Sequence, residues 1–276
     1  MLYLIATPIG NISDITIRAL QTLEICSHIL CEDTRVAKKL ISFLHSKNLL
    51  KNMDFTYISL HSHNEDSRVE SIESNFYQDN NIALISDAGM PCISDPGYKI
   101  IKNIQKNNIP YTIIPGCSSV ISAFALSGFG DKNFKFIGFL PHKRQDKISL
   151  FHKILDEDSI TVCFESPKRI LDSMQILNDI SPNREIFIAK EITKIFEKFY
   201  CGNVRDVLEK LRVANLNGEW VIVINIDSNN TKKQYLKIED IISLSIPPKI
   251  KAKILAKLIG KNTQDCYNEI INQGKK

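Results

Sequence analysis

The chain lacks most of the short motifs that mark common enzyme classes. It has no Gly-x-Gly-x-x-Gly, no Walker A loop and no Gly-x-Ser-x-Gly, which argues against a dinucleotide site, a P-loop and a nucleophilic serine elbow. None of its seven cysteines forms a Cys-x-x-Cys pair, so neither structural zinc nor a disulfide framework is expected. No apolar run approaches the length of a membrane span, and no early segment has the pattern of a signal peptide. We therefore expect a reduced cytoplasmic protein with no metal centre and no membrane association.

Positive charge is concentrated at one end of the chain. Residues 227–276 hold ten lysines and five acids, whereas residues 1–226 hold 25 basic and 26 acidic side chains. A basic appendage on a near-neutral body favours contact with a polyanion. The alternative is a solvated, lysine-rich tail.

Strand-like and helix-like runs alternate along residues 1–130. This alternation predicts an α/β fold, with a mostly parallel sheet covered by helices. A second α/β set occupies residues 131–227. Strands follow one another there without a helix around Thr193, which predicts a mixed sheet. Residues 227–233 are polar and indicate a linker, and residues 234–276 predict a small basic helical domain.

Helical periodicity predicts which side chains face the core. Over residues 34–44 these are Val36, Leu40 and Phe43, and over residues 248–259 they are Ile250, Ile254 and Leu258. Two helix starts are also predicted: Asp14 as a cap for a helix over 15–23, and Pro167 as the first residue of a helix over 167–177.

Four loops rich in Gly, Pro, Asp and Ser follow predicted strands, and if the strands are parallel they meet at one sheet edge. They are residues 7–11, 32–35, 87–97 and 114–119. Ligands of open α/β sheets bind at that edge. The third loop, with Gly89 and Gly97, suits a small-molecule cradle, although a plain strand-to-helix connector is an even alternative. Ser118 and Ser119 can hold a polar ligand group or simply cap a helix, and Asp33 with Arg35 can be a structural ion pair.

The ordered set of motifs resembles the tetrapyrrole methylase superfamily. Within it, the resemblance is to enzymes that methylate a cytidine ribose 2'-oxygen in small-subunit ribosomal RNA. The matching segments are residues 2–11, 14–16, 18–20, 31–35, 60–65, 86–97, 138–141, 164–166 and 190–194. The resemblance covers about residues 1–226. It implies two tetrapyrrole-methylase-like α/β lobes, over residues 1–130 and 131–227, and a homodimer.

The resemblance also implies S-adenosylmethionine, bound between the lobes. Carried over by motif, its contacts are Pro8, Asp87, Ala88, Gly89, Met90, Ile93, Ser118, Ser119, Phe164 and Thr193. One departure is that Cys117 stands where a second proline commonly follows the glycine. We expect Cys117 to be a packing residue, because methyl transfer from a sulfonium needs no covalent enzyme intermediate.

A ribose hydroxyl is a poor nucleophile, so a general base is expected. The candidates are Glu165, Asp33, His63 and Lys190. Glu165 is narrowly preferred, with a partner role for Arg169 or Lys168 as its alternative. His63, with His61, Asn64 and Glu65, could also bind a metal, but further ligands are missing. Candidate phosphate contacts are Arg35, Lys168, Arg169, Lys249, Lys253 and Lys257.

The resemblance predicts methylation of a cytidine in the decoding centre of 16S ribosomal RNA, with the 30S subunit as the substrate. Two other functions stay open. One is methylation of a tetrapyrrole or another small molecule, and the other is a non-catalytic RNA-binding or assembly factor that retains a cofactor cleft. The residue 32–35 and 61–65 segments and the basic tail favour the RNA substrate.

Overall fold

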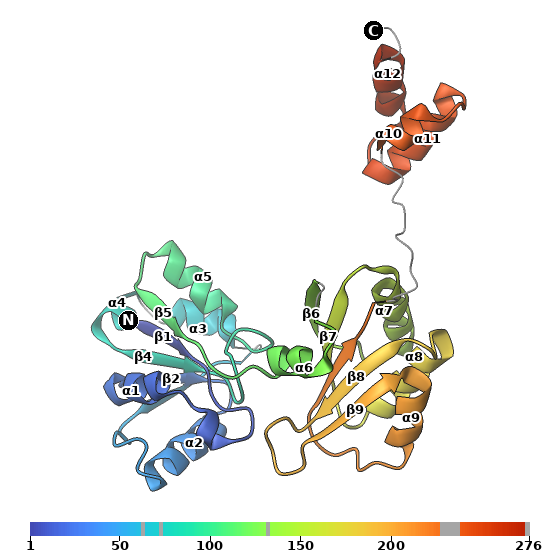
Figure 1. Ribbon diagram of the computed structural model, residues 1–276. Helices are drawn as coiled ribbons and strands as arrows, with labels where there is room; N and C mark the ends of the chain where they lie inside the picture. Colours follow the sequence, from blue (N-terminus) through green and yellow to red (C-terminus); the bar gives the residue numbers. More distant parts are fainter. Residues whose placement is uncertain (62–63, 72–73, 131–132, 227–237, 274–276) are drawn as a thin grey trace. The chain divides into compact units, whose positions relative to one another are not determined.

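The computed structural model describes residues 1–61, 64–71, 74–130, 133–226 and 238–273. The chain forms two compact units, Met1–Asp227 and Ser228–Lys276 (Figure 1). The predicted linker over residues 227–233 lies outside the described residues. The described residues include no helix of sufficient length and apolarity to cross a membrane.

The first sheet is fully parallel, as the alternation predicted. Its strands lie in the order β3-β2-β4-β1-β5. They are β1 (Leu2–Ile5), β2 (His28–Cys31), β3 (Thr56–Ser59), β4 (Ile82–Ile85) and β5 (Tyr111–Ile114). Every residue of the central strand β4 is buried, which explains why its sequence is continuously apolar.

Helices cover both faces of this sheet. Ala83 and Ile85 pack with α1 (Ile17–Ile25) and α2 (Thr34–Ser46), while Ile82 and Leu84 pack with α4 (Ser74–Asp79) and α5 (Tyr98–Lys106). The short helix α3 (Glu65–Ser71) lies beside α5. Each fully buried Leu or Ile side chain stabilises the fold by roughly 1.5–3 kcal/mol.

Two local predictions in this half are wrong. Asp14 ends a short 3₁₀ helix, Ile12–Asp14, and Thr16 caps α1 instead, accepting a hydrogen bond from the Ala19 amide. Helix α2 buries Ala37, Ile41 and Leu44, whereas Val36 and Phe43 are 38% and 44% exposed. The buried stripe is therefore rotated by one residue from the predicted one.

The second sheet is mixed, again as predicted. Its order is β6-β7-β10-β8-β9, with β6 parallel to β7 and the other neighbours antiparallel. The strands are β6 (Phe134–Phe139), β7 (Ile160–Glu165), β8 (Glu185–Lys190), β9 (Lys198–Asn203) and β10 (Trp220–Ile224). Residues 131–132 lie outside the description, and the domain boundary predicted there stays a prediction.

The two faces of the second sheet are covered by different parts of the chain. Helices α7 (Arg144–Asp156), α8 (Ile170–Ile180) and α9 (Val204–Arg212) pack on one face. Helix α6 (Ser119–Ser127) packs on the other, although it directly follows β5 of the first sheet (Figure 1). Pro167 does not begin α8, because residues 167–169 form a turn and Arg169 is the N-cap.

The second unit contains α10 (Ile238–Ser243), α11 (Pro248–Ile259) and α12 (Thr263–Gln273). Its small core consists of Ile241, Ala252, Leu255, Ala256 and Cys266. The predicted stripe is wrong here too, since Ile250 and Leu258 are 48% and 54% exposed. Lys249, Lys253 and Lys257 are all exposed, as their proposed role in phosphate contact requires.

Candidate functional site

The four predicted loops follow β1, β2, β4 and β5, which are parallel neighbours in register. Their carboxyl ends therefore lie at the same edge of the first sheet, as expected. This edge is where open α/β sheets bind ligands.

Backbone hydrogen bonds join the first and third loops. Thr7 and Gly89 form an isolated bridge, with N···O distances of 2.9 and 3.1 Å. The Ser86 hydroxyl donates to the Gly89 carbonyl at 3.0 Å. Gly89 has φ of +85°, and a Cβ there would lie 3.2 Å from Cγ2 of Ile9 and 3.5 Å from the carbonyl oxygen of Cys117. The first, third and fourth loops thus converge on a position that only glycine fits easily.

The second loop is tied to the third through acidic residues. The Asp33 amide donates to Oδ1 of Asp87 at 3.3 Å, and the Asp33 carboxylate caps α2. The Arg35 guanidinium donates to both Asp33 oxygens and holds the pKa of that carboxyl down at about 2. The structural ion pair is therefore present. A carboxylate with so low a pKa is a weak proton acceptor.

Three other carboxyl groups at this edge have raised pKa values. Burial raises the pKa of Asp87, and burial with the nearby Asp87 raises the pKa of Glu32. Burial with Glu32 and Asp87 raises the pKa of Asp95 to about 6. The edge thus combines one strongly ionised carboxylate with carboxyls that accept protons more readily.

A turn from the second sheet contacts the first loop. The Asn11 amide donates to Oγ1 of Thr193 at 3.1 Å. A Cβ on Gly10 would lie 2.4 Å from Cγ of Lys194 and 2.8 Å from Oγ1 of Thr193. Glu191 and Thr193 both adopt positive φ, +52° and +67°. Such conformations cost energy in non-glycine residues and concentrate at functional sites.

Aromatic residues of β6 and β7 approach the third loop. Phe164 packs edge-on against Phe136 and Phe139, with ring centres 4.9 and 5.3 Å apart. β6 bulges between these two partners, and Gly138 in the bulge has a positive φ. A Cβ on Gly138 would lie 4.0 Å from the Ser94 hydroxyl. The predicted contact Phe164 therefore belongs to an aromatic cluster beside the point where β6 approaches Ser94, and its cofactor contact stays a prediction.

An open hollow of about 430 Å³ lies between the first and fourth loops and the Thr193 turn. It is lined by Ile9, Asp14, Thr16, Gly116, Cys117, Ser122 and Thr193. This volume falls within the usual range for small-molecule sites. Of the ten predicted cofactor contacts only Thr193 lines it. Ile9 and Cys117 were missed, and their adjacency to Pro8 and Ser118 was the available signal.

The other predicted contacts lie in the converging loops. Ser118 caps α6 by accepting from the Ile121 amide at 3.4 Å, so helix capping is part of its role. Asp87, Ala88 and Ile93 are exposed in the third loop. Pro8, Met90 and Ser119 are half-buried, and their cofactor contacts stay predictions.

Glu165 has the structural role that was its alternative. Its carboxylate is 2% exposed and accepts from the Ser166 amide, the Ser173 hydroxyl and Arg169, the last at 2.7 Å. Lys147, also buried, lies 3.7 Å away. Both oxygens of this carboxylate are engaged in a buried network, which favours the structural alternative, and a role for Glu165 as general base stays a prediction.

Two further predicted residues, Lys190 and Arg169, have structural partners. The Lys190 ammonium is buried over Trp220 and donates to the Asn215 carbonyl at 2.6 Å, which makes it structural. Arg169 is bound to Glu165 and the Leu140 carbonyl, which gives it a structural role, and its phosphate contact stays a prediction. His63 lies outside the described residues. Lys168 is exposed, and its phosphate contact stays a prediction.

Comparison with known sequences gives consistent results along the chain. Residues 1–208 match the family described as Tetrapyrrole (Corrin/Porphyrin) Methylases. A protein of Helicobacter pylori (strain J99 / ATCC 700824) is 38% identical over 100% of this chain and 99% of its own length. A protein of Campylobacter fetus subsp. fetus is 39% identical over 98% and 100%. Both are named Ribosomal RNA small subunit methyltransferase I.

Solved structures agree on the fold. The uroporphyrin-III-C-methyltransferase of Thermus thermophilus superposes with a TM-score of 0.56 at 16% identity, over 81% of this chain and 93% of its own. The methyltransferase CobJ gives 0.59 at 14% identity, over 82% and 94%. Family match, full-length relatives and shared fold lead to one conclusion: the chain belongs to the tetrapyrrole methylases, whose methyl donor is S-adenosylmethionine.

Proposed function

We propose that this protein transfers a methyl group from S-adenosylmethionine to the ribose 2'-oxygen of a cytidine in the decoding centre of 16S ribosomal RNA. We further propose that it acts in the cytoplasm on the 30S subunit. The observation that carries this is the identity of 38–39% with ribosomal RNA methyltransferases over the full length of both chains. The solved tetrapyrrole methylases, at 14–16% identity, support only the fold.

The converging loops suit the methyl donor. The space in front of Gly89 is one that a Cβ would fill, between Ile9 and the Cys117 carbonyl. Backbone groups there can hold a small polar molecule closely, and Ser118 begins a helix whose first amides face a ligand. When bound, S-adenosylmethionine supplies a methyl group on a cationic sulfur. The protein's part is to orient the acceptor hydroxyl in line and to exclude water.

Asp87 is the described carboxylate best placed to accept the hydroxyl proton. It is exposed in the third loop, two residues from Gly89, and its pKa is raised by burial. Asp33 holds it in place by donating a backbone hydrogen bond to Oδ1. Because the low pKa of Asp33 makes it a poor base, we assign proton acceptance to Asp87 and orientation to Asp33.

We also propose a homodimer. Ile195 and Phe196 are 96% and 75% exposed in the turn before β9, which is an edge strand of the second sheet. Exposed apolar side chains beside an open strand edge suit a second copy of the chain. Sedimentation of the full chain should give twice the chain mass, and a monomer at micromolar concentration would contradict this.

The decisive test is methyl transfer from labelled S-adenosylmethionine to 30S particles that lack the modification. We expect one labelled cytidine ribose per particle, identified by nuclease digestion and mass spectrometry. Free 16S RNA, a porphyrin and a corrinoid serve as competing substrates. Label on a tetrapyrrole would contradict the proposal in favour of a small-molecule methylase. Cofactor binding without transfer to any substrate would indicate a non-catalytic binding protein.

A further inference from the structure

The outward side of α2 carries charge of only one sign. From residue 34 to residue 53 the sequence has five basic residues and no acid: Arg35, Lys38, Lys39, Lys47 and Lys51. The helix turns Ala37, Ile41 and Leu44 to the core and half-buries Leu40, while Arg35, Val36, Lys38, Lys39, Ser42, Phe43 and Ser46 are exposed. We call residues Arg35, Val36, Lys38, Lys39, Ser42, Phe43 and Ser46 the α2 outer face. With Asp33 they line an open hollow.

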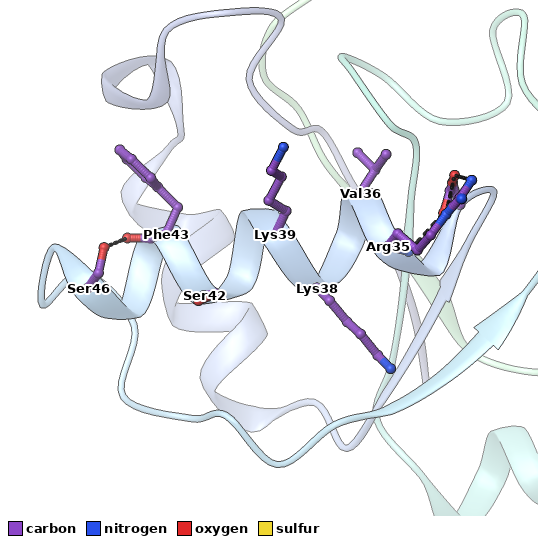
Figure 2. A pocket seen from close by; sticks show the side chains of 8 residues that line it. Arg35, Val36, Lys38, Lys39, Ser42, Phe43 and Ser46 are labelled. Carbon is purple, nitrogen blue, oxygen red and sulfur yellow. Dashed lines mark hydrogen bonds and ion pairs between the residues drawn. The ribbon is translucent and has the colours of Figure 1, made fainter.

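The exposed aromatic ring of Phe43 lies on the same helix as these cations. Figure 2 shows Val36, Lys39 and Phe43 in a row along one side of the helix, with Lys38 on the other side. The Lys38 ammonium lies 5.3 Å from the centre of the Tyr57 ring, and that of Lys47 lies 5.5 Å from the centre of the Phe43 ring. Among the described residues no acidic group forms an ion pair with Lys38 or Lys39. Basic side chains beside an exposed aromatic ring suit a nucleic-acid strand, whose phosphates and bases they can bind.

The helix also begins at the proposed methyl-transfer site. Thr34, its first residue, follows Asp33, whose amide is bonded to Asp87. With 13 residues, α2 extends about 20 Å from that point. A strand lying along the α2 outer face therefore has one end at the loops that hold the methyl donor.

We propose that the α2 outer face binds the ribosomal RNA strand next to the methylated nucleotide. Lys38 and Lys39 would contact phosphates, and a base would stack on Phe43. This rests on the proposed RNA substrate. A second copy of the chain is the weaker occupant, because a two-fold interface sets a patch against itself. Lys38 and Lys39, which form no ion pair among the described residues, would then face the same two lysines of the other copy.

The test compares full-length variants for binding to 30S particles over a series of salt concentrations. Lys38→Gln/Lys39→Gln should weaken binding on the order of tenfold at 0.1 M salt. It should also make the salt slope shallower by about one unit per lysine. Phe43→Ala should weaken binding at least about fivefold with an unchanged slope, because stacking is not ionic. Affinity for S-adenosylmethionine should be unchanged in both.

Lys102→Gln/Lys106→Gln is the matched control, since it removes the same charge from α5 on the opposite face of the sheet. Its binding and slope should equal those of the wild type. If Lys38→Gln/Lys39→Gln behaves like this control, the proposal is overturned. A loss of dimer mass in Phe43→Ala with unchanged 30S binding would assign the face to a second copy instead. Wild-type binding without methyl transfer would defeat the proposed function while leaving this surface standing.

Discussion

The backbone amide of Asn11 lies 3.1 Å from Oγ1 of Thr193 and donates to it, which ties a loop of the first sheet to a turn of the second. The two residues are 182 positions apart in sequence. The contact belongs to a tight approach in which Gly10 has no room for a side chain. The proposed methyl-donor site therefore includes residues from both sheets, and its parts can be tested one by one.

Gly89→Val should abolish S-adenosylmethionine binding in a chain that stays folded. The added side chain would fill the space between Ile9 and the Cys117 carbonyl. Isothermal calorimetry measures the affinity, and circular dichroism checks the fold. Gly128→Val is the matched control, because Gly128 also has a positive φ but no atom lies within 4 Å of its Cβ position. Equal affinities in the two variants would refute the cradle.

Asp87→Asn should lower kcat by about 10²–10⁴, since it removes the proposed proton acceptor. The raised pKa of Asp87 sets the sign of the pH dependence. The base must be ionised, so wild-type kcat should rise as pH rises through that pKa, and the rise should vanish in the variant. If kcat of Asp87→Asn still rises with pH as it does in the wild type, another group must accept the proton.

Glu165→Ala should lower the free energy of unfolding by about 3–5 kcal/mol, because it removes the buried carboxylate that pairs with both Arg169 and Lys147. Glu165→Gln should keep hydrogen bonds to Ser166 and Ser173, so its free energy of unfolding should fall by less than that of Glu165→Ala. Denaturant unfolding gives these values. Because the proposed base is Asp87 and not Glu165, the pH profile of kcat in Glu165→Gln should match the wild type. A displaced profile would restore Glu165 to catalysis.

Lys249→Gln/Lys253→Gln/Lys257→Gln should weaken 30S binding and make its salt slope shallower by about three units, with unchanged affinity for S-adenosylmethionine. All three lysines are exposed on α11, away from its buried Ala252, Leu255 and Ala256. Deleting residues 227–276 should have at least the same effect. A wild-type slope in both variants would show that the basic tail is a passive solvated segment.

The sequence predicted strands and their connections well because buried parallel strands have a distinctive composition. The alternation over residues 1–130 correctly predicted a parallel sheet, whose central strand β4 is buried and apolar along its whole length. The absence of a helix between β8 and β9 correctly indicated a mixed sheet.

Helix faces could not be predicted because two apolar stripes compete. In α2 the stripe Val36, Leu40 and Phe43 is larger than the stripe Ala37, Ile41 and Leu44, yet the second is buried. Neighbouring stripes differ by only about 100° of rotation, so periodicity alone does not choose between them. In α11 the buried stripe likewise contains small residues, Ala252 and Ala256.

The role of Glu165 could be predicted only in part: its partner Arg169 is four residues away, whereas its partner Lys147 is distant in sequence. Alternate residues of a strand point to opposite faces. Phe164 therefore joins the cluster that includes α6, whereas Cys163 joins the core under α7 and α8. The partner Lys147 comes from α7, and no local pattern around Glu165 indicates it.

The position of α6 has a consequence for synthesis. The helix leaves the ribosome before any strand of the second sheet, and Val120 and Ala123 find their complete surroundings only once β10 has emerged. That is about a hundred residues later, or about 5 to 20 seconds at usual elongation rates. During this interval the apolar face of α6 is exposed on the nascent chain, because the sheet that buries it has not yet been synthesised. Chaperones would engage at that stage, and a fragment ending after α6 would aggregate when expressed alone.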